Sequence, residues 1–391
     1  MNVLALVTDA FGGVGGIAQY NRDLLTALAR CGTRVVVVPR LGHVGQSELP
    51  PGLRQLGPKK SKLVYAFAAF CAAITEAPFD AVFCGHLHLG PLSAIIARIL
   101  GVPLWLQLYG FEAWGCPTGP QRWAAECAAM TTAISRYTRR RFLRVAKVDP
   151  ARVRVLPCTF DERFVPGPKP DYLVARHRLH GKRVLLTISR LASTECYKGH
   201  DKIIQALPAI TCPDLIYVIG GEGEDRVRLE ALTQELGVQD KVLFLGMIEP
   251  SELADYYRLA DVFLMPSTQE GFGIVFLEAA ASGLTPIGGN CDGSVDALAD
   301  GEIGFTINPE SSDGLVRAIS EALAGRGPDP AGVRRFRFEK FARQVSELTS
   351  SYLLQCPSSR ELPDAVTNFC SQDHAKSEMD QGAYPASDSL N

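Results

Sequence analysis

Two glutamates separated by seven residues carry the clearest chemical signal in the sequence. Glu270 lies in a loop that follows an expected strand, and Glu278 lies in the second turn of a helix expected to begin near Gly273. The two carboxylates are therefore not one catalytic pair on one helix face, and we expect them to contact different parts of one extended ligand. The backbone N–H groups of Phe272, Gly273 and Ile274 would lie at the helix N-terminus, where they could donate to hydroxyl groups of that ligand. The alternative is an exposed glutamate and a second glutamate held by an unidentified base.

Two cations form the second group. Arg190 lies where a strand ends, and Lys198 lies near the start of the next helix. Ligands of open α/β sheets bind beyond the carboxyl ends of the strands, where an arginine and a lysine could together neutralise a diphosphate. The alternative is two solvated surface cations. Because no Asp-x-Asp occurs in the chain, we expect no metal ion and no other cofactor, and the two cations would supply the positive charge.

A glycine-rich segment, residues 11–17, joins the first expected strand to the first expected helix. Glycines allow close approach of the backbone to a ligand, and a helix N-terminus favours anions. Gly13, Gly15 and Ala18 match the dinucleotide fingerprint, but the second strand ends in Arg40 and lacks the acid that binds a nicotinamide ribose. The sequence therefore disfavours a nicotinamide oxidoreductase, and a simple tight turn remains the alternative.

Weaker signals come from a second glycine cluster and a histidine pair. Gly221 lies in a Gly-Gly-Glu-Gly run after a strand, which suggests another close backbone approach. His86 and His88 lack a third plausible metal ligand in the sequence, so we expect a structural or acceptor-side role for them.

Composition places the chain among ordinary globular proteins. It has 391 residues, of which 47% are hydrophobic and 21% charged, and a net charge of −2 that implies no general affinity for nucleic acid. Eleven cysteines without a Cys-x-x-Cys pair predict reduced, mostly buried thiols in a cytoplasmic protein. We expect neither a signal peptide nor a membrane-spanning helix, and the apolar run 63–74 favours a core helix.

Short apolar runs alternate with helical patterns along the chain. Nearly continuous Val, Ile and Leu runs are typical of strands buried on both faces of a parallel sheet. The alternation is interrupted by a proline-rich segment at 164–170 and then restarts, which predicts two doubly wound α/β domains. The expected units are two Rossmann-like domains, N-terminal and C-terminal, a last helix and a disordered tail, at 1–165, 171–333, 334–354 and 355–391.

In this order, the motifs resemble those of family 4 glycosyltransferases, the large retaining family with two facing Rossmann-like domains (the glycosyltransferase B-type fold). The resemblance covers roughly residues 1–354 and is most specific in the second half. The segments that carry it are Gly15-Gly16, Leu156-Pro157-Cys158-Thr159-Phe160-Asp161, Ser189-Arg190-Leu191, Lys198-Gly199, Gly220-Gly221-Glu222-Gly223, Phe244-Leu245-Gly246, Pro266-Ser267 and Glu270 with Glu278.

The resemblance implies that the domain at 1–165 binds the acceptor and the domain at 171–333 binds the nucleotide sugar. It also implies a role for each matching residue. Arg190 and Lys198 would hold the donor diphosphate, which Gly15 and Gly16 would approach from the other domain. Glu270 would contact the transferred sugar, with help from amides near Phe272 and Gly273. Glu278 would accept hydrogen bonds from the ribose diol, and the last helix would cross back to the first domain.

Three departures from the family pattern concern its reacting centre, its linker and its cation spacing. Many members have a His-Gly where this chain has Tyr109-Gly110, so the acceptor-side candidates are Tyr109, His86 and His88. Cys158-Thr159 replaces the usual Asn-Gly, and the spacing from Arg190 to Lys198 is slightly longer than is common.

These features predict a retaining, metal-independent hexosyltransferase. The donor would be a nucleotide sugar of the GDP-mannose or UDP-glucose type, and the acceptor a glycan or polyprenyl-linked molecule in surface polysaccharide biosynthesis. Basic clusters at 59–62 and 136–147 suggest an anionic membrane surface as a further partner, with the protein cytoplasmic or peripheral on the cytosolic face of the inner membrane. The alternatives are a sugar-nucleotide epimerase of the same fold and a non-catalytic sugar-nucleotide-binding subunit.

Overall fold

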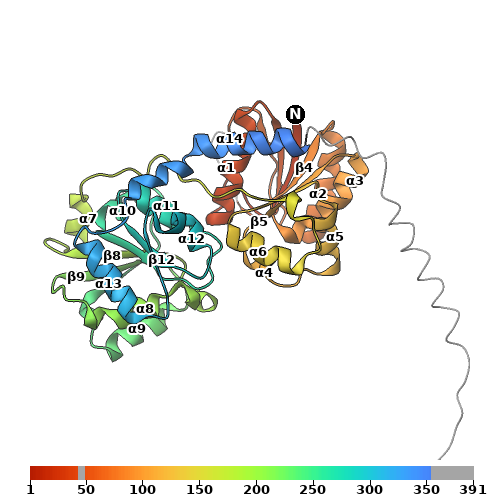
Figure 1. Cartoon of the computed structure of the whole chain (residues 1–391). Helices are drawn as coiled ribbons and strands as arrows, with labels where there is room; N and C mark the ends of the chain where they lie inside the picture. The colour runs from red at the N-terminus through yellow and green to blue at the C-terminus, as the bar shows by residue number, and fades with distance from the viewer. Residues whose placement is uncertain (43–48, 354–391) are drawn as a thin grey trace, which may run out of the picture.

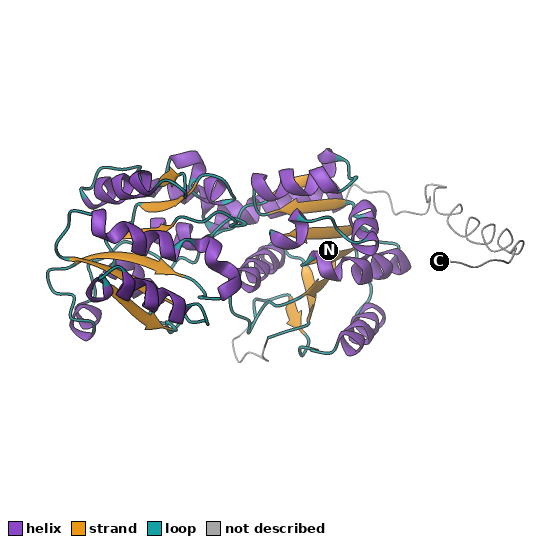
Figure 2. Ribbon diagram, turned by 90° about the horizontal axis from the view of Figure 1, so that it is seen from below, coloured by secondary structure: helices purple, strands orange, loops and turns teal. Residues whose placement is uncertain are grey.

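The structure, a computed structural model, describes residues 1–42 and 49–353. Two α/β units lie side by side, each with a sheet between layers of helices (Figures 1 and 2). The expected tail at 355–391 and the last residue of the expected final helix lie outside the described residues.

The first unit contains a seven-stranded sheet of order β3-β2-β1-β4-β5-β6-β7, in which all pairs are parallel. Its strands are β1 Asn2–Val7, β2 Arg34–Pro39, β3 Leu53–Gln55, β4 Ala81–Cys84, β5 Leu104–Leu108, β6 Met130–Ala133 and β7 Val153–Val155. Its helices are α1 Gly16–Arg30, α2 Lys62–Thr75, α3 Gly90–Leu100, α4 Phe111–Trp114, α5 Gly119–Cys127 and α6 Arg136–Val145.

The second unit repeats this architecture with six parallel strands in the order β10-β9-β8-β11-β12-β13. Its strands are β8 Arg183–Ile188, β9 Leu215–Gly220, β10 Val242–Gly246, β11 Val262–Met265, β12 Pro286–Gly289 and β13 Phe305–Ile307. Its helices are α7 Asp171–Arg176, α8 His200–Ala206, α9 Arg226–Glu235, α10 Leu253–Leu259, α11 Ile274–Ala281, α12 Ser294–Ala297 and α13 Ser312–Leu323. Both units have the doubly wound, Rossmann-like topology that the alternation of apolar runs predicts.

The last helix crosses back to the first unit, as Figure 1 shows. It is not the single helix expected over 334–354, because Arg337 adopts an extended conformation and separates a 3₁₀ segment, Pro330–Phe336, from α14, Phe338–Leu348. A π turn, Thr349–Leu353, follows. On α14, Phe341 packs edge-on against Tyr20 of α1 at 5.7 Å between ring centroids. The hydrophobic core that includes this pair continues into the second unit, so α14 joins the two units.

The prediction that residues 63–74 form a core helix is wrong. They form most of α2, but only the stripe of Tyr65, Ala69, Ala72 and Ala73 is buried. Four of the larger apolar side chains of this helix point to solvent instead: Leu63, Val64, Phe67 and Ile74. The sequence pattern fails here because a run that is apolar on every face does not say which face packs on the sheet.

The expectation of mostly buried thiols is also wrong. Nine cysteines lie in the described residues and all are unpaired, but only Cys84 and Cys158 are buried. The exposed thiols lie in loops, at helix ends and in the short 3₁₀ segment Ser193–Lys198, where burial is limited: Cys31, Cys116, Cys127, Cys196 and Cys291.

Candidate functional site

Arg190 lies two residues beyond Ile188, the last residue of β8, and is positioned by the second glycine cluster. The backbone N–H of Leu191 donates to the carbonyl oxygen of Glu222 at 2.8 Å, so the two loops run together beyond the strand ends. A Cβ on Gly221 would lie 1.8 Å from the carbonyl oxygen of Ser189, and the φ of Gly221 is +134°. Only glycine fits this position. The close backbone approach that the sequence predicts at Gly221 is therefore an approach to another part of the chain.

The two predicted phosphate cations converge on one carboxylate. Glu195 accepts a hydrogen bond from the guanidinium of Arg190, and its Oε2 lies 3.0 Å from Nζ of Lys198. The side chain of Arg190 is 79% exposed, whereas those of Lys198 and Glu195 are 13% and 11% exposed. Gly199 holds Lys198 against the end of β11, since a Cβ there would lie 2.6 Å from the carbonyl oxygen of Pro266. The cations therefore form one cluster, and they are not two independent surface charges.

Glu270 lies in the loop after β11, next to this cluster. A second carboxylate, Asp292, fixes the loop by accepting hydrogen bonds from the backbone N–H of Glu270 and from Oγ of Ser267, both at 2.7 Å. Burial raises the pKa of Glu270; the charge of Lys198 lowers it, and that of Asp292 raises it again. Burial also raises the pKa of Asp292, which is 2% exposed. The loop is thus held by a buried carboxyl group that carries no motif in the sequence.

Helix α11 begins at Ile274, as the sequence predicts, and Gly273 precedes it with φ +88°. A Cβ on Gly273 would lie 2.6 Å from the ring of Phe276, so glycine is required at this turn. The side chain of Phe272 is buried against Phe336 at 5.9 Å between ring centroids. Phe272 can therefore offer a ligand only its backbone.

Glu278, in the second turn of α11, has the partner that the sequence left unidentified. It is not a base but a hydroxyl group: Oη of Tyr257 on α10 donates to Oε2 of Glu278 at 2.7 Å. Burial raises the pKa of Glu278, and the Tyr257 hydrogen bond opposes this shift. Tyr257 bonds only one of the two oxygens of the half-buried Glu278 carboxylate. The other oxygen could still accept a hydrogen bond from a hydroxyl group of a ligand.

The two units meet at the ends of α1 and α11 and at the loop after β5. A Cβ on Gly16 would lie 3.9 Å from Cδ1 of Ile274, so the two helix N-termini face each other. A Cβ on Gly271 would lie 2.4 Å from the carbonyl oxygen of Tyr109. The structure therefore brings Gly16, which adjoins Gly15, to the α11 N-terminus, and Tyr109 to the Glu270 loop.

The acceptor-side candidates turn away from this meeting point to different degrees. Tyr109 is 6% exposed, and its hydroxyl donates to Oδ1 of Asn21 on α1 at 2.6 Å. His86 lies 6.2 Å from the ring of Tyr109, and burial, together with the neighbouring His88, lowers its pKa to about 4. His88 is exposed and lies 2.7 Å from the amide of Gln121. Among the residues that the structure describes, no group of three or more His, Cys, Asp or Glu side chains could hold a metal ion.

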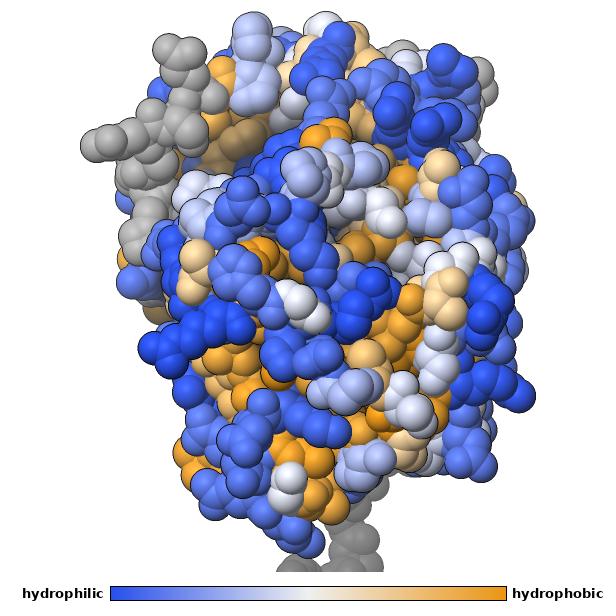
Figure 3. All heavy atoms as spheres, turned by 90° about the vertical axis from the view of Figure 1, so that its left-hand side faces the viewer, coloured by the Kyte–Doolittle hydropathy of each residue, from blue (hydrophilic) through white to orange (hydrophobic). Residues whose placement is uncertain are grey.

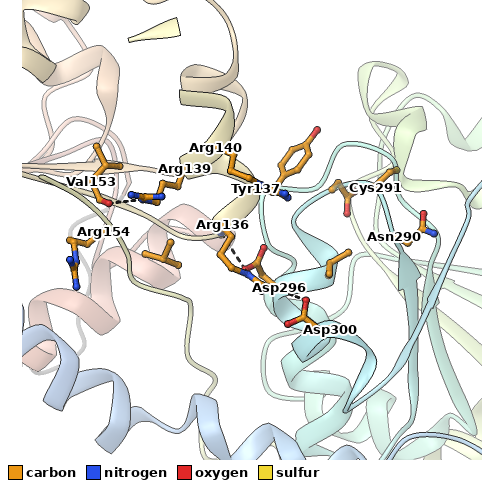
Figure 4. A pocket seen from close by; sticks show the side chains of 13 residues that line it. Arg136, Tyr137, Arg139, Arg140, Val153, Arg154, Asn290, Cys291, Asp296 and Asp300 are labelled. Carbon is orange, nitrogen blue, oxygen red and sulfur yellow. Dashed lines mark hydrogen bonds and ion pairs between the residues drawn. The ribbon is translucent and has the colours of Figure 1, made fainter. Parts of the chain in front are cut away.

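A cavity of about 750 Å³ opens between the units, beside the Glu270 loop (Figure 4). Arg136 at the start of α6 spans it by donating to Asp296 and Asp300 of the second unit, at 2.6 and 2.7 Å. None of the residues predicted for the site lines this cavity, but Asp292 does. The cavity therefore adjoins the back of the Glu270 loop.

Sequence reasoning missed four residues of this arrangement: Glu195, Asp292, Tyr257 and Asn21. A signal existed for Glu195, because it occupies the unusually long stretch between the two cations. The others come from segments far from the motifs they support, and only the folded chain brings them together.

Two family models match the chain in the same order as its two units. A glycosyl transferase 4-like domain matches residues 15–159, and the glycosyl transferases group 1 family matches residues 173–345. The chain belongs to the group 1, family 4-type glycosyltransferases. Each matched region contains the motif residues of its own α/β unit.

Named relatives fall in the same family. A GDP-mannose-dependent alpha-(1-6)-phosphatidylinositol monomannoside mannosyltransferase of Mycolicibacterium smegmatis is 32% identical over 207 residues, which is 50% of this chain and 53% of the relative. This match thus spans about half the length of the relative. A D-inositol 3-phosphate glycosyltransferase of Xylanimonas cellulosilytica is 28% identical over 375 residues, covering 86% of this chain and 88% of the relative.

Solved structures agree in fold. Anabaena Alr3699/HepE in complex with UDP and glucose superposes with a TM-score of 0.73 at 20% identity, over 90% of this chain and all of the other. The lipopolysaccharide outer core galactosyltransferase WaaB, in its apo form, gives 0.69 at 17% identity, over 90% of this chain and 99% of the other. The chain thus has the glycosyltransferase B-type fold that its motifs imply.

Proposed function

We propose that this protein transfers a hexose from a nucleotide-sugar donor, of the GDP-mannose or UDP-glucose type, to a glycan or lipid-linked acceptor. The transfer retains the anomeric configuration and uses no metal ion. The observation that carries the proposal is the convergence of Arg190 and Lys198 on a single carboxylate beside Glu270. Two cations already gathered around one anionic group suit a diphosphate.

The wider arrangement supports the same donor. The pair of cations lies beyond the carboxyl ends of the β8 and β11 strands, where open α/β sheets bind ligands. The facing N-termini of α1 and α11 add N–H groups and partial positive charge from both sides of the cleft. Glu270 would accept hydrogen bonds from the sugar, and Glu278 would accept them from the ribose diol beside Tyr257.

In this mechanism the bond from the anomeric carbon to the donor diphosphate breaks, and positive charge develops at the sugar. The departing diphosphate lies on the same face as the incoming acceptor hydroxyl, takes its proton and leaves the configuration unchanged. Arg190, Lys198 and the helix N-terminus stabilise the leaving diphosphate, an effect worth several kcal/mol in a site that excludes water.

The relatives' names guide the choice of acceptor. One combines a GDP-mannose donor with a phosphatidylinositol monomannoside, and another glycosylates D-inositol 3-phosphate.

We propose a role in building surface polysaccharide, with the protein in the cytoplasm and peripheral on an anionic membrane. Of the two basic clusters, the one on α6 is partly committed to the protein, because Arg136 bonds the second unit and Arg139 donates to carbonyl oxygens of Val153 and Pro150.

The test is a panel of nucleotide sugars with glycan and lipid-linked acceptors, after a thermal-shift screen has found the donor. Arg190→Ala and Glu270→Ala are expected to lower turnover by two orders of magnitude or more, with an unchanged melting temperature for Arg190→Ala because its side chain is largely exposed. Full activity in both variants would refute the residue assignments. Product formed from donor alone would instead identify an epimerase.

A second candidate is a non-catalytic nucleotide-sugar-binding subunit. The observation that favours it is Tyr109, which replaces the common histidine and gives its hydroxyl to Asn21 rather than to the cleft. Donor binding at micromolar concentration with no turnover on any acceptor would support this alternative.

A further inference from the structure

Helix α2 has the reverse of the side-chain distribution expected of a surface helix. A helix that covers a sheet normally buries its large apolar residues and presents polar ones to solvent. On α2 the buried stripe is mostly alanine with Tyr65, and Phe70 packs partly against the core, but four other large apolar side chains are outside: Leu63, Val64, Phe67 and Ile74 are 84%, 50%, 71% and 77% exposed. Leu63, Phe67 and Ile74 follow the helical repeat and so share one face.

This outer face carries no charge of its own. Residues 63–75 contain no Asp, Glu, Lys or Arg, so nothing on the helix beyond its first residue is ionic. The neighbouring helix α3, which packs against α2, adds two more exposed apolar side chains, Ile95 and Ile99. Exposed groups of large apolar side chains of this kind mark a docking surface. By contrast, hydrophilic side chains are spread among apolar ones over the outer end of the second unit (Figure 3).

Positive charge lies at one end of the apolar face. Lys59, Lys60 and Lys62 are all exposed at the start of α2. The first acidic residue that follows, Glu76, is already paired with Arg34 and Arg54 at 2.8 and 2.7 Å. The lysines are therefore not balanced by any acidic residue on α2 itself.

The combination identifies the partner. Large apolar side chains next to unbalanced lysines match a bilayer surface, where the apolar groups enter the acyl boundary and the lysines contact anionic headgroups. A second copy that docked through the same face would bring the same lysines and no acidic side chain of α2, and lysine is depleted in protein–protein interfaces. We propose that the apolar face of α2, with Lys59, Lys60 and Lys62, docks the protein onto an anionic lipid membrane.

This inference rests on the peripheral-membrane part of the proposed function and places it on α2. Every helix within 1–42 and 49–353 falls short of the length and apolarity needed to cross a bilayer. Docking on α2 would hold the first unit, which contributes the acceptor-side candidates, against the surface that carries a lipid-linked acceptor. The loop after β5 would then lie on a unit anchored directly to the membrane.

The experiment is flotation of the full chain with vesicles of phosphatidylcholine alone and with 30% phosphatidylglycerol, at low and at high salt. The wild-type protein should float with the anionic vesicles at low salt. Leu63→Ser, Phe67→Ser and Ile74→Ser combined should lower the bound fraction at least tenfold, and so should Lys59→Gln, Lys60→Gln and Lys62→Gln combined. The control replaces two exposed apolar residues of the second unit, Val227→Ser with Met247→Ser, and should float like the wild type.

Because all the substituted side chains are exposed, the melting temperature of each variant should stay within a few degrees of the wild type. Flotation needs no turnover, so its outcome is separate from the donor and acceptor assays. Failure of the wild type to float with anionic vesicles at low salt would overturn the inference. So would a dimer in analytical ultracentrifugation that the α2 serine variant abolishes, since the face would then join two copies of the chain.

Discussion

Oε2 of Glu195 lies 3.0 Å from Nζ of Lys198. The same carboxylate accepts a hydrogen bond from Arg190, so in the free protein it occupies the centre of the cluster proposed to hold the donor diphosphate. A bound diphosphate would offer the two cations the same kind of charge. We therefore expect the donor diphosphate and Glu195 to compete for Arg190 and Lys198, so that Glu195 lowers the affinity for the donor.

The first prediction concerns this competition. Glu195→Gln removes the negative charge but keeps the shape of the side chain. We expect the dissociation constants of UDP or GDP, whichever binds, to fall about three- to tenfold, the scale of one partly exposed ion pair. Isothermal titration calorimetry measures this directly.

The matched control is Glu224→Gln, since Glu224 accepts from Ser193 in the same loop without touching either cation. It should leave the dissociation constant unchanged. Weaker binding in Glu195→Gln would contradict the competition and would mean that Glu195 instead orders the cations for the ligand.

The second prediction concerns Asp292, which holds the Glu270 loop. Asp292→Asn replaces one carboxylate oxygen by an N–H₂ group. In place of Oδ2 this group would face both the backbone N–H of Glu270 and the hydroxyl of Ser267, and in place of Oδ1 it would face the backbone N–H of Ser294. We expect a loss of about 1–3 kcal/mol in the free energy of unfolding and a fall in turnover. Urea denaturation and steady-state assays measure the two effects, with exposed Asp313→Asn as the control. Wild-type stability would show that the loop is held by other contacts.

The fold could be predicted from the sequence because its signals are local. Buried parallel strands form continuous apolar runs, and the structure has two parallel sheets on either side of the proline-rich segment 164–170, as those runs predict. Segments as short as the three-residue strands β3 and β13 carry no periodicity of their own. The predicted last helix is too long. Its break at Arg337 comes from backbone geometry and not from a proline or glycine, so the sequence does not indicate it.

The candidate site was predictable only in part. Arg190, Lys198 and Glu270 each lie at a strand or helix end, where position along the chain indicates position in the cleft. Asp292, by contrast, meets Glu270 across a separation of 22 residues, and Asn21 meets Tyr109 across 88. Contacts of this kind depend on sheet order and packing, and a single sequence does not contain them as a pattern. The exposed face of α2 escaped prediction for the same reason.

The third prediction concerns Tyr109. Tyr109→Phe keeps the ring that packs edge-on against Tyr20 at 5.5 Å, and it removes the hydroxyl that donates to buried Asn21. An unsatisfied buried acceptor costs about 1–3 kcal/mol, so we expect a loss of stability of that size with turnover almost unchanged. Denaturant unfolding and steady-state kinetics separate the two. Exposed Tyr172→Phe, which loses a hydrogen bond to Asp255, should cost less than about 1 kcal/mol. A large loss of turnover in Tyr109→Phe would instead give the hydroxyl a direct part in the reaction.

The fourth prediction concerns pH and His200, which is 4% exposed behind the cation cluster. Its Nε2 lies 2.8 Å from Oγ of Ser189 and its Nδ1 lies 3.0 Å from Oη of Tyr217. Burial, and then the charge of Lys198, lowers the pKa of His200 from 6.5 to about 4. The unfolded chain therefore takes up a proton at this histidine before the folded protein does.

The sign follows from that order of protonation. The stability that neutral His200 supports is fully present above pH 6.5 and is lost as the pH falls toward 4, by up to about 3 kcal/mol. Buried carboxyl groups such as Glu270, whose pKa is raised, act in the opposite direction, so the comparison must isolate the histidine. The difference in free energy of unfolding between wild type and His200→Gln, measured by urea denaturation from pH 7.5 to 4.5, should shrink as the pH falls. His180→Gln, at an exposed histidine, is the matched control substitution. A His200→Gln difference that stays constant over this range would mean that His200 carries its proton in the folded protein as readily as in the unfolded chain.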